Sequence, residues 1–518
     1  MIVREGCYGQ SSPFFNVKPA TTYILFTYLI FKVCTAFSVN TGNSFLFSKE
    51  LVNAYTDIQK LRLENARDIL RKEKAKGVPN GVISYLESYS DFFYFLVTDH
   101  QQEFASFTKK QDTRLQQLSM LSDTSPYQRM LMAEIRLHSA FVKLKFGNRT
   151  SGCWDIIRAN KLLAENVRLF PDFIPQLKSL GLLHVMIGSV PEEYQWVARM
   201  MGLKGTISQG IAELGRVEKE SELFGKEAQV IALLLQAYML QPDAMLLSKL
   251  REITYEEPDN LLFHFLSASI LMKQGKSEAA LAILDKAPRG SEYVSFPFLH
   301  YMRAEVNLQK GFYEKALAGY DNFLKLSKGS NFVKDSYFKK FLCAWLGRDI
   351  QPQMGLLSRV MDNGAANVEA DKHAQKTAER FLANKIYDEQ KVLFEARYAF
   401  DGGFLSEALS LFKGLNEASF THLHSKIEYN YRLGRILQQQ GKTGEAIPFL
   451  KRALQMNLGY DYYFGASAAL QLGYIYRNAG QTDKASDFFR KAMSFKKHEY
   501  KNSIDNKAKA ALTESGAG

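Results

Sequence analysis

A repeated pattern of small and bulky positions runs through the second half of the chain. Five stretches align on a glycine with an alanine five residues later, a small residue seven residues before the glycine, and a bulky apolar residue four after the alanine. The aligned glycines are Gly275, Gly311, Gly403, Gly441 and Gly480. The alanines are Ala280, Ala316, Ala408, Ala446 and Ala485, and the small residues are Ala268, Ala304, Ala396, Gly434 and Gly473. The bulky residues are Leu284, Tyr320, Phe412, Leu450 and Phe489.

This pattern predicts pairs of antiparallel helices. Small residues let two helices approach closely, the bulky residue fills the seam, and glycine supplies the turn. Consecutive glycines stand 36 residues apart from 275 to 311, 38 from 403 to 441, and 39 from 441 to 480. That spacing resembles the period of about 34 of tetratricopeptide repeats, most clearly at 427–495. We therefore expect an all-α, tetratricopeptide-repeat-type superhelical solenoid.

Two of the turns read Gly-Lys-Thr (441–443) and Gly-Lys-Ser (275–277), like the end of a phosphate-binding loop. Such a loop needs a first glycine five residues before the second and a strand before it. Ile436 and Ile270 occupy those positions, after helical patterns. We interpret both as inter-helix turns, with Thr443 and Ser277 as helix N-caps.

The chain divides into four expected segments: 1–40, 45–245, 246–495 and 496–518. The second has a helical period with degenerate repeats, the third holds the repeats with a helical insertion near 361–385, and the fourth is a basic capping helix and tail. In the first, Tyr23–Phe31 is apolar and Lys32 follows. That length suits a secretory signal better than a membrane span. We expect export to the periplasm, the outer membrane or the medium; an uncleaved N-terminal anchor is the alternative.

The net charge is +12 and the sequence pI is about 9.2. Lysine and arginine gather at 489–512, so this end could attract an acidic partner or an anionic surface, although a solvated cap helix explains it as well. No groove-reading or base-stacking motif indicates nucleic acid. The four cysteines form no C-x-x-C pair, and we expect Cys153 and Cys343 to be separate buried thiols.

The sequence offers little for catalysis. His422 and His424, two apart, do not share a helix face, and no further ligand completes a metal site. No G-x-S-x-G nucleophile motif occurs. We expect no enzyme activity, no cofactor and no metal.

Two blocks resemble the tetratricopeptide repeat protein 39 family, which includes the yeast inclusion-body clearance protein. In 176–214, Gly202, Leu203, Gly205 and Gly210 stand at the positions of that family's glycine-containing stretch, with Thr206 replacing its aspartate. The block 369–404 follows the family's E-K-F-A segment loosely. The resemblance implies a helical scaffold. Handling of inclusions or lipid bodies is known for some relatives, but an export signal does not fit that role.

The predicted function is a non-catalytic scaffold that binds a protein or peptide in a concave groove. The groove-facing, solvent-exposed positions should be Glu428, Tyr431, Arg435 and Gln438, then Ser467, Leu470, Tyr474 and Arg477. Tyr431, Arg435, Gln438, Tyr474 and Arg477 are the candidate partner-binding residues, since Tyr and Arg often anchor interfaces. The alternative is an exported binder of a small molecule or nutrient, which a deep aromatic pocket would favour.

Overall fold

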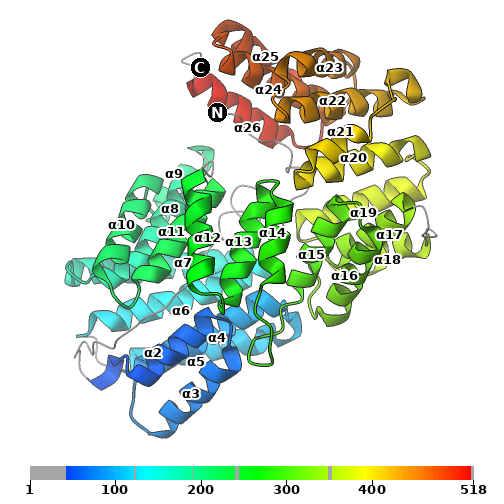
Figure 1. Cartoon of the computed structure of the whole chain (residues 1–518). Coiled ribbons are helices and arrows are strands. Elements are labelled where there is room, and N and C mark those ends of the chain that lie inside the picture. Colours follow the sequence, from blue (N-terminus) through cyan, green and yellow to red (C-terminus); the bar gives the residue numbers. More distant parts are fainter. Residues whose placement is uncertain (1–42, 122–123, 191, 240–243, 348–352, 515–518) are drawn as a thin grey trace.

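The structure is a computed structural model. It describes residues 43–121, 124–190, 192–239, 244–347 and 353–514. Every regular element in these ranges is a helix, and they contain no strand (Figure 1). The expected all-α fold is confirmed. None of the helices described is long and apolar enough to cross a membrane. The expected export signal lies outside the described residues.

The helices of the first half are α2 Lys49–Gln59, α3 Leu63–Ala75, α4 Gly81–Thr98, α5 Phe104–Ser119, α6 Pro126–Lys145, α7 Arg149–Leu169, α8 Leu177–Gly188, α9 Glu192–Met200, α10 Ile207–Glu220, α11 Gly225–Met239 and α12 Ala244–Glu256. Those of the second half are α13 Leu261–Lys273, α14 Ser277–Asp285, α15 Phe298–Gln309, α16 Tyr313–Leu326, α17 Val333–Leu346, α18 Gly355–Asp362, α19 Glu369–Leu382, α20 Lys391–Gly402, α21 Leu405–Ser410, α22 Leu423–Gln439, α23 Thr443–Met456, α24 Tyr463–Asn478, α25 Thr482–Ser494 and α26 Lys501–Glu514. Short 3-10 turns lie at Asn43–Phe45, Gln101–Glu103, Ile174–Gln176, Asp388–Gln390 and Glu417–Ser419.

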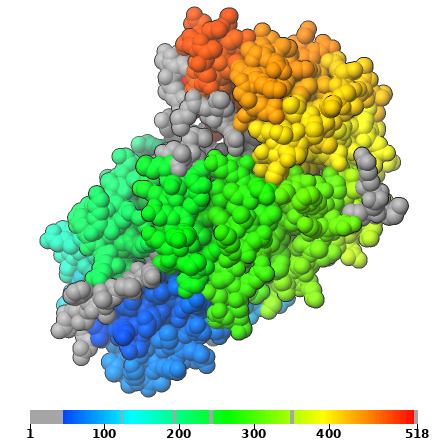
Figure 2. All heavy atoms as spheres, in the orientation of Figure 1, coloured from blue at the N-terminus to red at the C-terminus, as the bar shows by residue number. Residues whose placement is uncertain are grey.

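Neighbouring helices pack as hairpins, and the hairpins stack in chain order. The pairs α13/α14, α15/α16, α22/α23 and α24/α25 each pack together, and α23 packs in turn on α24. The stack leads from α2–α5 at one end to α22–α26 at the other (Figure 1), and the surface view has the same elongated outline (Figure 2). The protein is thus a solenoid of antiparallel helix pairs. The expected segment boundaries stay predictions.

The repeated glycines form the turns that the sequence predicts. Gly275, Gly311, Gly403, Gly441 and Gly480 all have positive φ, between 61° and 83°. Only glycine reaches this left-handed region without steric cost. The Gly-Lys-Thr and Gly-Lys-Ser sequences are therefore inter-helix turns, as expected.

The expected N-caps at these turns are wrong by one residue. Helix α14 begins at Ser277 and α23 at Thr443, so Lys276 and Lys442 hold the cap positions, without a side-chain cap bond. The left-handed glycine leaves one half-helical residue before the helix. The hydroxyl residue thereby becomes the first helical residue, from which it does not reach the free N–H groups.

The seams between paired helices are as tight as the pattern implies. A Cβ on Gly473 would lie 2.5 Å from two ring carbons of Phe489, and one on Gly434 would lie 2.8 Å from Cγ of Leu450. Phe489 and Leu450 are both fully buried. The backbone at Gly434 and Gly473 has no positive φ, so backbone conformation does not require glycine there. Glycine is required instead because any larger side chain would prevent the close approach of the helices.

The block 176–214 departs from the repeat geometry. Helices α8 and α10 cross at Gly181 and Gly210, where a Cβ on Gly210 would lie 2.2 Å from the Gly181 carbonyl oxygen. Thr206 caps α10, because its Oγ1 accepts a hydrogen bond from Gln209 N at 3.1 Å. This residue thus supplies an N-cap oxygen, which an aspartate could also supply.

The first helices fold back on the middle of the chain. Lys60 and Arg62, at the α2–α3 turn, both pair with Asp259, and Arg62 Nη2 lies 2.9 Å from Asp259 Oδ2. Val294 N donates a hydrogen bond to Leu61 O at 2.9 Å. These contacts join residues 197 to 233 positions apart, so this part of the solenoid is tied to more than its chain neighbours.

Two buried lysines each hold a pair of carboxylates in the core. Lys178 Nζ lies 3.2 Å from Glu134 Oε2 and 2.9 Å from Glu227 Oε2, and the Tyr55 and Tyr89 hydroxyls donate to Glu227. Burial raises the pKa of Glu227, while Lys178 opposes that rise. This set has two carboxylates for one lysine. The two tyrosine hydroxyls supply the further hydrogen bonds that the buried Glu227 carboxylate needs.

The second lysine set repeats this composition in α15–α17. Lys339 Nζ lies 2.6 Å from Glu305 Oε1 and 2.8 Å from Asp335 Oδ2. The Tyr301 hydroxyl donates to Asp335 and that of Tyr320 to Glu305, each at 2.5 Å. Because these groups have few alternative partners in the core, they favour one arrangement of the three helices.

The C-terminal helix α26 packs on α24 and α25 and buries Ile504 and Ala508, so it lies over the last repeat. Cys343 is buried as expected, but Cys153 is exposed, and both are free thiols. The expectation for Cys153 was wrong, because it lies on an exposed part of α7 next to the exposed Trp154.

Candidate functional site

The predicted partner-binding residues lie on α22 and α24, but the expectation of solvent exposure is wrong for most of them. Tyr431, Arg435, Gln438 and Tyr474 are only 8%, 2%, 4% and 5% exposed. Glu428, Ser467 and Leu470 are buried as well, whereas Arg477 is half-buried. We call these eight residues the α22/α24 face.

Packing between successive hairpins accounts for the burial on α22. The Tyr431 ring lies 6.1 Å from the Tyr463 ring and 5.5 Å from the Phe464 ring, both at the start of α24. The Arg435 guanidinium lies over the Phe400 ring of α20, 5.5 Å from its centroid. The predicted face is thus also a packing face between α20, α22 and α24.

On α24, Tyr474 packs between the two helices of its own repeat, α24 and α25. The Tyr474 ring meets the Phe489 ring edge-on at 5.3 Å, and the Arg477 guanidinium lies 5.2 Å from the Tyr474 ring centroid. Tyr474 is therefore a core residue that supports Arg477. Among the candidate partner-binding residues, Arg477 is the one that is half-exposed in the described part of the chain.

Three charged residues that the sequence analysis did not single out, Arg397, Asp401 and Arg432, lie close to this face, and Arg432 pairs with Glu428 of the face. Arg432 Nε donates to Glu428 Oε1 at 2.7 Å, and Arg397 Nε lies 3.8 Å from Asp401 Oδ2. Burial raises the pKa of Asp401 to about 7, although Arg397 opposes the rise. Burial alone would raise the pKa of Glu428, but Arg432 lowers it overall. Each pair is separated by four residues, a spacing that could have marked them as ion pairs on one helix face.

The two histidines that the sequence analysis considered as metal ligands have ordinary structural partners. His422 Nδ1 lies 3.0 Å from Glu389 Oε1, and its ring stacks on Tyr387. His424 lies edge-on to Tyr462. In the ranges that the structure describes, no group of three or more His, Cys, Asp and Glu side chains is arranged to hold a metal ion.

A separate cavity of about 130 Å³ lies between the first helices and the middle of the chain. We call it the aromatic cavity, since its walls include Phe93, Phe265, Phe296, Phe298, Phe323 and Phe332. These rings come from α4, α13, the segment before α15, α15, α16 and the residue before α17. Sequence reasoning missed it, because rings from such distant segments share no local pattern.

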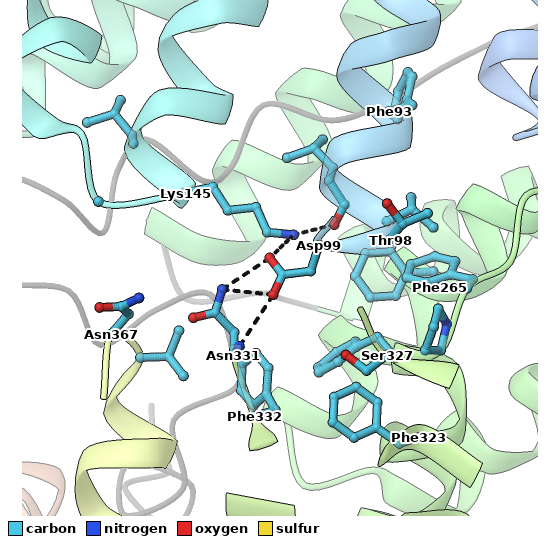
Figure 3. A pocket seen from close by; sticks show the side chains of 18 of the residues that line it. Phe93, Thr98, Asp99, Lys145, Phe265, Phe323, Ser327, Asn331, Phe332 and Asn367 are labelled. Carbon is cyan, nitrogen blue, oxygen red and sulfur yellow. Dashed lines mark hydrogen bonds and ion pairs between the residues drawn. The ribbon is translucent and has the colours of Figure 1, made fainter. Parts of the chain in front are cut away.

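One side of the aromatic cavity is polar (Figure 3). Asp99 Oδ1 lies 3.0 Å from Lys145 Nζ, and Asn331 Nδ2 donates to the same carboxylate at 3.1 Å. Lys145 Nζ also donates to Leu96 O at 2.6 Å. Figure 3 shows these three polar groups on one side and Phe265 and Phe323 on the other. The Asp99–Lys145–Asn331 interactions connect the ends of α4 and α6 to the start of α17. The aromatic cavity lies beside these three residues.

Comparison with known proteins identifies the C-terminal part of the chain. Residues 427–498 match the family described as tetratricopeptide repeat. A search of curated proteins gives no match. Accordingly, 427–498 contains tetratricopeptide repeats, while the resemblance to the protein 39 family is not confirmed.

Two solved structures align along most of the chain. The structure titled as the P58(IPK) TPR domain is 17% identical, with 81% of this chain and 99% of that chain covered, and has a TM-score of 0.21. The structure of yeast Tom70 is 12% identical, covers 82% and 97%, and has a TM-score of 0.22. At these scores neither alignment supports a functional argument.

Proposed function

We propose that this protein is a non-catalytic repeat scaffold that binds a protein or peptide partner through the α22/α24 face. The observation that carries the proposal is the set of tetratricopeptide repeats at 427–498, whose stacked helix pairs give extended contact surface. The Tyr and Arg side chains on that face are of the types that most often dominate interfaces.

Because most of the face is buried, its residues have two different roles: structural support and partner contact. Tyr431, Arg435, Gln438 and Tyr474 are buried and would fix the shape of the surface, while the half-exposed Arg477 would contact the partner. Tyr474 lies under the Arg477 guanidinium and limits its motion, so less entropy is lost when the guanidinium binds.

Partner capture by the full chain, followed by mass spectrometry, tests the proposal. Arg477→Ala should leave folding intact and weaken the binding free energy of the partner by about 1 kcal/mol or more. Arg490→Ala, an exposed arginine on α25, is the matched control and should bind as the wild type does. An Arg477→Ala protein that keeps every partner at wild-type affinity would rule out this face as the contact surface.

Replacing both tyrosines should have a different result. Tyr431→Ala/Tyr474→Ala removes two buried rings, and each large-to-small change in a core costs roughly 2–5 kcal/mol. We therefore expect a lower melting temperature along with lost capture. A double variant that melts like the wild type would mean that the rings are not core.

A second candidate function is binding of a small apolar molecule, and the aromatic cavity favours it. Its volume of about 130 Å³ is similar to engineered apolar cavities of about 150 Å³ that bind benzene. Benzene, toluene and indole should then raise the melting temperature of the wild type. The effect should disappear in Val97→Phe, whose added ring would occupy the cavity. A shift that persists in Val97→Phe, or no shift with any of the three, would contradict this function.

A further inference from the structure

A second surface, far along the chain from the α22/α24 face, lies among α3, α4 and α5. It is a groove of about 580 Å³, and we call it the basic groove. Helix α4 contacts both α3 and α5, so it forms the floor and they form the walls. The walls carry six cations: Arg67, Arg71 and Lys74 on α3, and Lys109, Lys110 and Arg114 on α5.

Helical spacing aligns these cations along the groove. On α3 they recur at intervals of four and three residues, which is the spacing of one helix face. On α5, Lys110 and Arg114 are four residues apart and follow the same rule, and Lys109 is adjacent to Lys110. Two cationic rows therefore line the groove.

The floor carries carboxylates, and the walls already pair with them. Lys74 Nζ lies 2.7 Å from Glu87 Oε1, and Arg114 Nη2 lies 2.8 Å from Asp91 Oδ2. The lining contains three carboxylates against the six cations, and Arg71 also pairs with Asp68, which lies outside the lining. The excess of positive charge therefore lies on Lys109 and Lys110. Lys109 and Lys110 are exposed on α5, and neither forms an ion pair with any residue that the structure describes.

Two polar atoms of the lining lack hydrogen-bond partners among the residues described. Ser90 Oγ on α4 is buried, with the residue 1% exposed, and Arg114 Nη1 on α5 is buried as well. Unsatisfied buried polar groups are rare in native proteins and call for an explanation. A ligand seated in the groove, directly or through a water molecule, would satisfy both.

We propose that the basic groove binds an extended, Asp/Glu-rich polypeptide segment. The ligand's carboxylates would pair with the lysine and arginine rows, while its backbone N–H groups would donate to Ser90 and to the floor carboxylates. Ser106 and Gln117 mark the ends of the α5 wall; eleven helical residues span about 16 Å, which matches about five residues of extended chain.

A nucleic acid fits this surface less well than a peptide. No aromatic side chain lines the groove, so bases have no stacking platform. A phosphodiester backbone has no donors for the carboxylates of the floor and would be repelled by them. The backbone N–H groups of a peptide meet the same carboxylates favourably.

Fluorescence anisotropy on the full chain tests the proposal, using a labelled peptide of Glu-Gly repeats about ten residues long, with both ends blocked. At low salt the peptide should bind, and binding should weaken as the salt concentration rises, because exposed charge pairs are screened. Lys109→Glu/Lys110→Glu should weaken binding about tenfold, since it removes two attractions and adds two repulsions.

The matched control is Lys496→Glu/Lys497→Glu, an exposed lysine pair near the other end of the chain. It changes the net charge equally and should leave binding within about twofold of the wild type. Ser90→Ala should weaken binding severalfold without loss of folding, since its hydroxyl has no partner among the described residues.

Equal loss in both lysine variants would show attraction to net charge alone and would overturn the groove. Equal binding of a Gln-Gly repeat peptide would overturn the requirement for acidic side chains. Tighter binding of a single-stranded DNA oligonucleotide, with the same dependence on Lys109 and Lys110, would assign the groove to nucleic acid instead. These outcomes are independent of whether the α22/α24 face binds a partner.

Discussion

Gly473 is the position at which the repeat geometry can be tested most directly. A Cβ there would meet two ring carbons of Phe489 at 2.5 Å, whereas carbon atoms in van der Waals contact lie about 3.5–4.0 Å apart. The ring, or one of the two helices, must therefore move by about 1 Å or more. Phe489 is fully buried and touches Tyr474, so it has little room to move.

We expect Gly473→Leu to lower the unfolding free energy of the C-terminal repeats by roughly 1–3 kcal/mol, the usual cost of overpacking. This would occur even though replacing a helical glycine ordinarily gains about 0.8–1 kcal/mol. Because stacked repeats stabilise one another, protection should also fall in the neighbouring hairpin α22/α23.

Native-state hydrogen exchange, read separately for α22–α25, measures this change, and thermal melting gives a second readout. Gly444→Leu is the matched control, because a Cβ at Gly444 meets nothing within 4 Å; it should be neutral or stabilising by up to about 1 kcal/mol. Gly473→Leu/Phe489→Ala should recover part of the loss, since it returns space to the seam. If Gly473→Leu is as stable as Gly444→Leu, the close approach of α24 and α25 is refuted.

Three further predictions concern pH, thiol reactivity and location. Burial raises the pKa of the Asp371 carboxyl to about 8. Between about pH 5 and 8 the folded state therefore keeps a proton that the unfolded state has released, so the free energy of unfolding should fall as the pH rises over this range. Melting scans should show that fall, and Asp371→Asn should flatten it; stability that rises over this range would contradict the burial argument. A short alkylation pulse with peptide mapping should label exposed Cys153 before buried Cys343, whose thiol pKa is raised by burial; equal labelling would be inconsistent with their burial. The segment 23–37 should direct export and be lost on maturation, which N-terminal sequencing from the native host can check; a cytoplasmic product that begins near Met1 would contradict it.

The turns and seams could be predicted from the sequence because their determinants are close together in the chain. A glycine, an alanine five residues later and a bulky residue after that are all set within one helix hairpin. Their recurrence at 275, 311, 403, 441 and 480 made the signal stronger than any single copy. The structure bears this out in the positive φ of each of those glycines.

Burial between hairpins was harder to predict. The helical period places Tyr431 and Arg435 on one face of α22, but it cannot say that α20 and α24 cover that face. The lysine set at Lys178 is a similar case: Glu134 and Glu227 lie 44 and 49 residues away in the chain, and no local pattern connects them. Such groups are brought together only by the tertiary fold.

The return of the first helices to the middle of the chain has a consequence for synthesis on the ribosome. Leu61 bonds to Val294, and Asp99 bonds to Asn331, which lies 232 residues later. Synthesis proceeds at about 5–20 residues per second, so these partners would emerge on the order of ten seconds or more after α2–α5. A linear repeat array can fold outward from any hairpin, but this end cannot close until two thirds of the chain has been made. Its apolar surface is therefore exposed longest to chaperones and to aggregation, and truncation from the C-terminus should be tolerated only down to the residues that complete this closure.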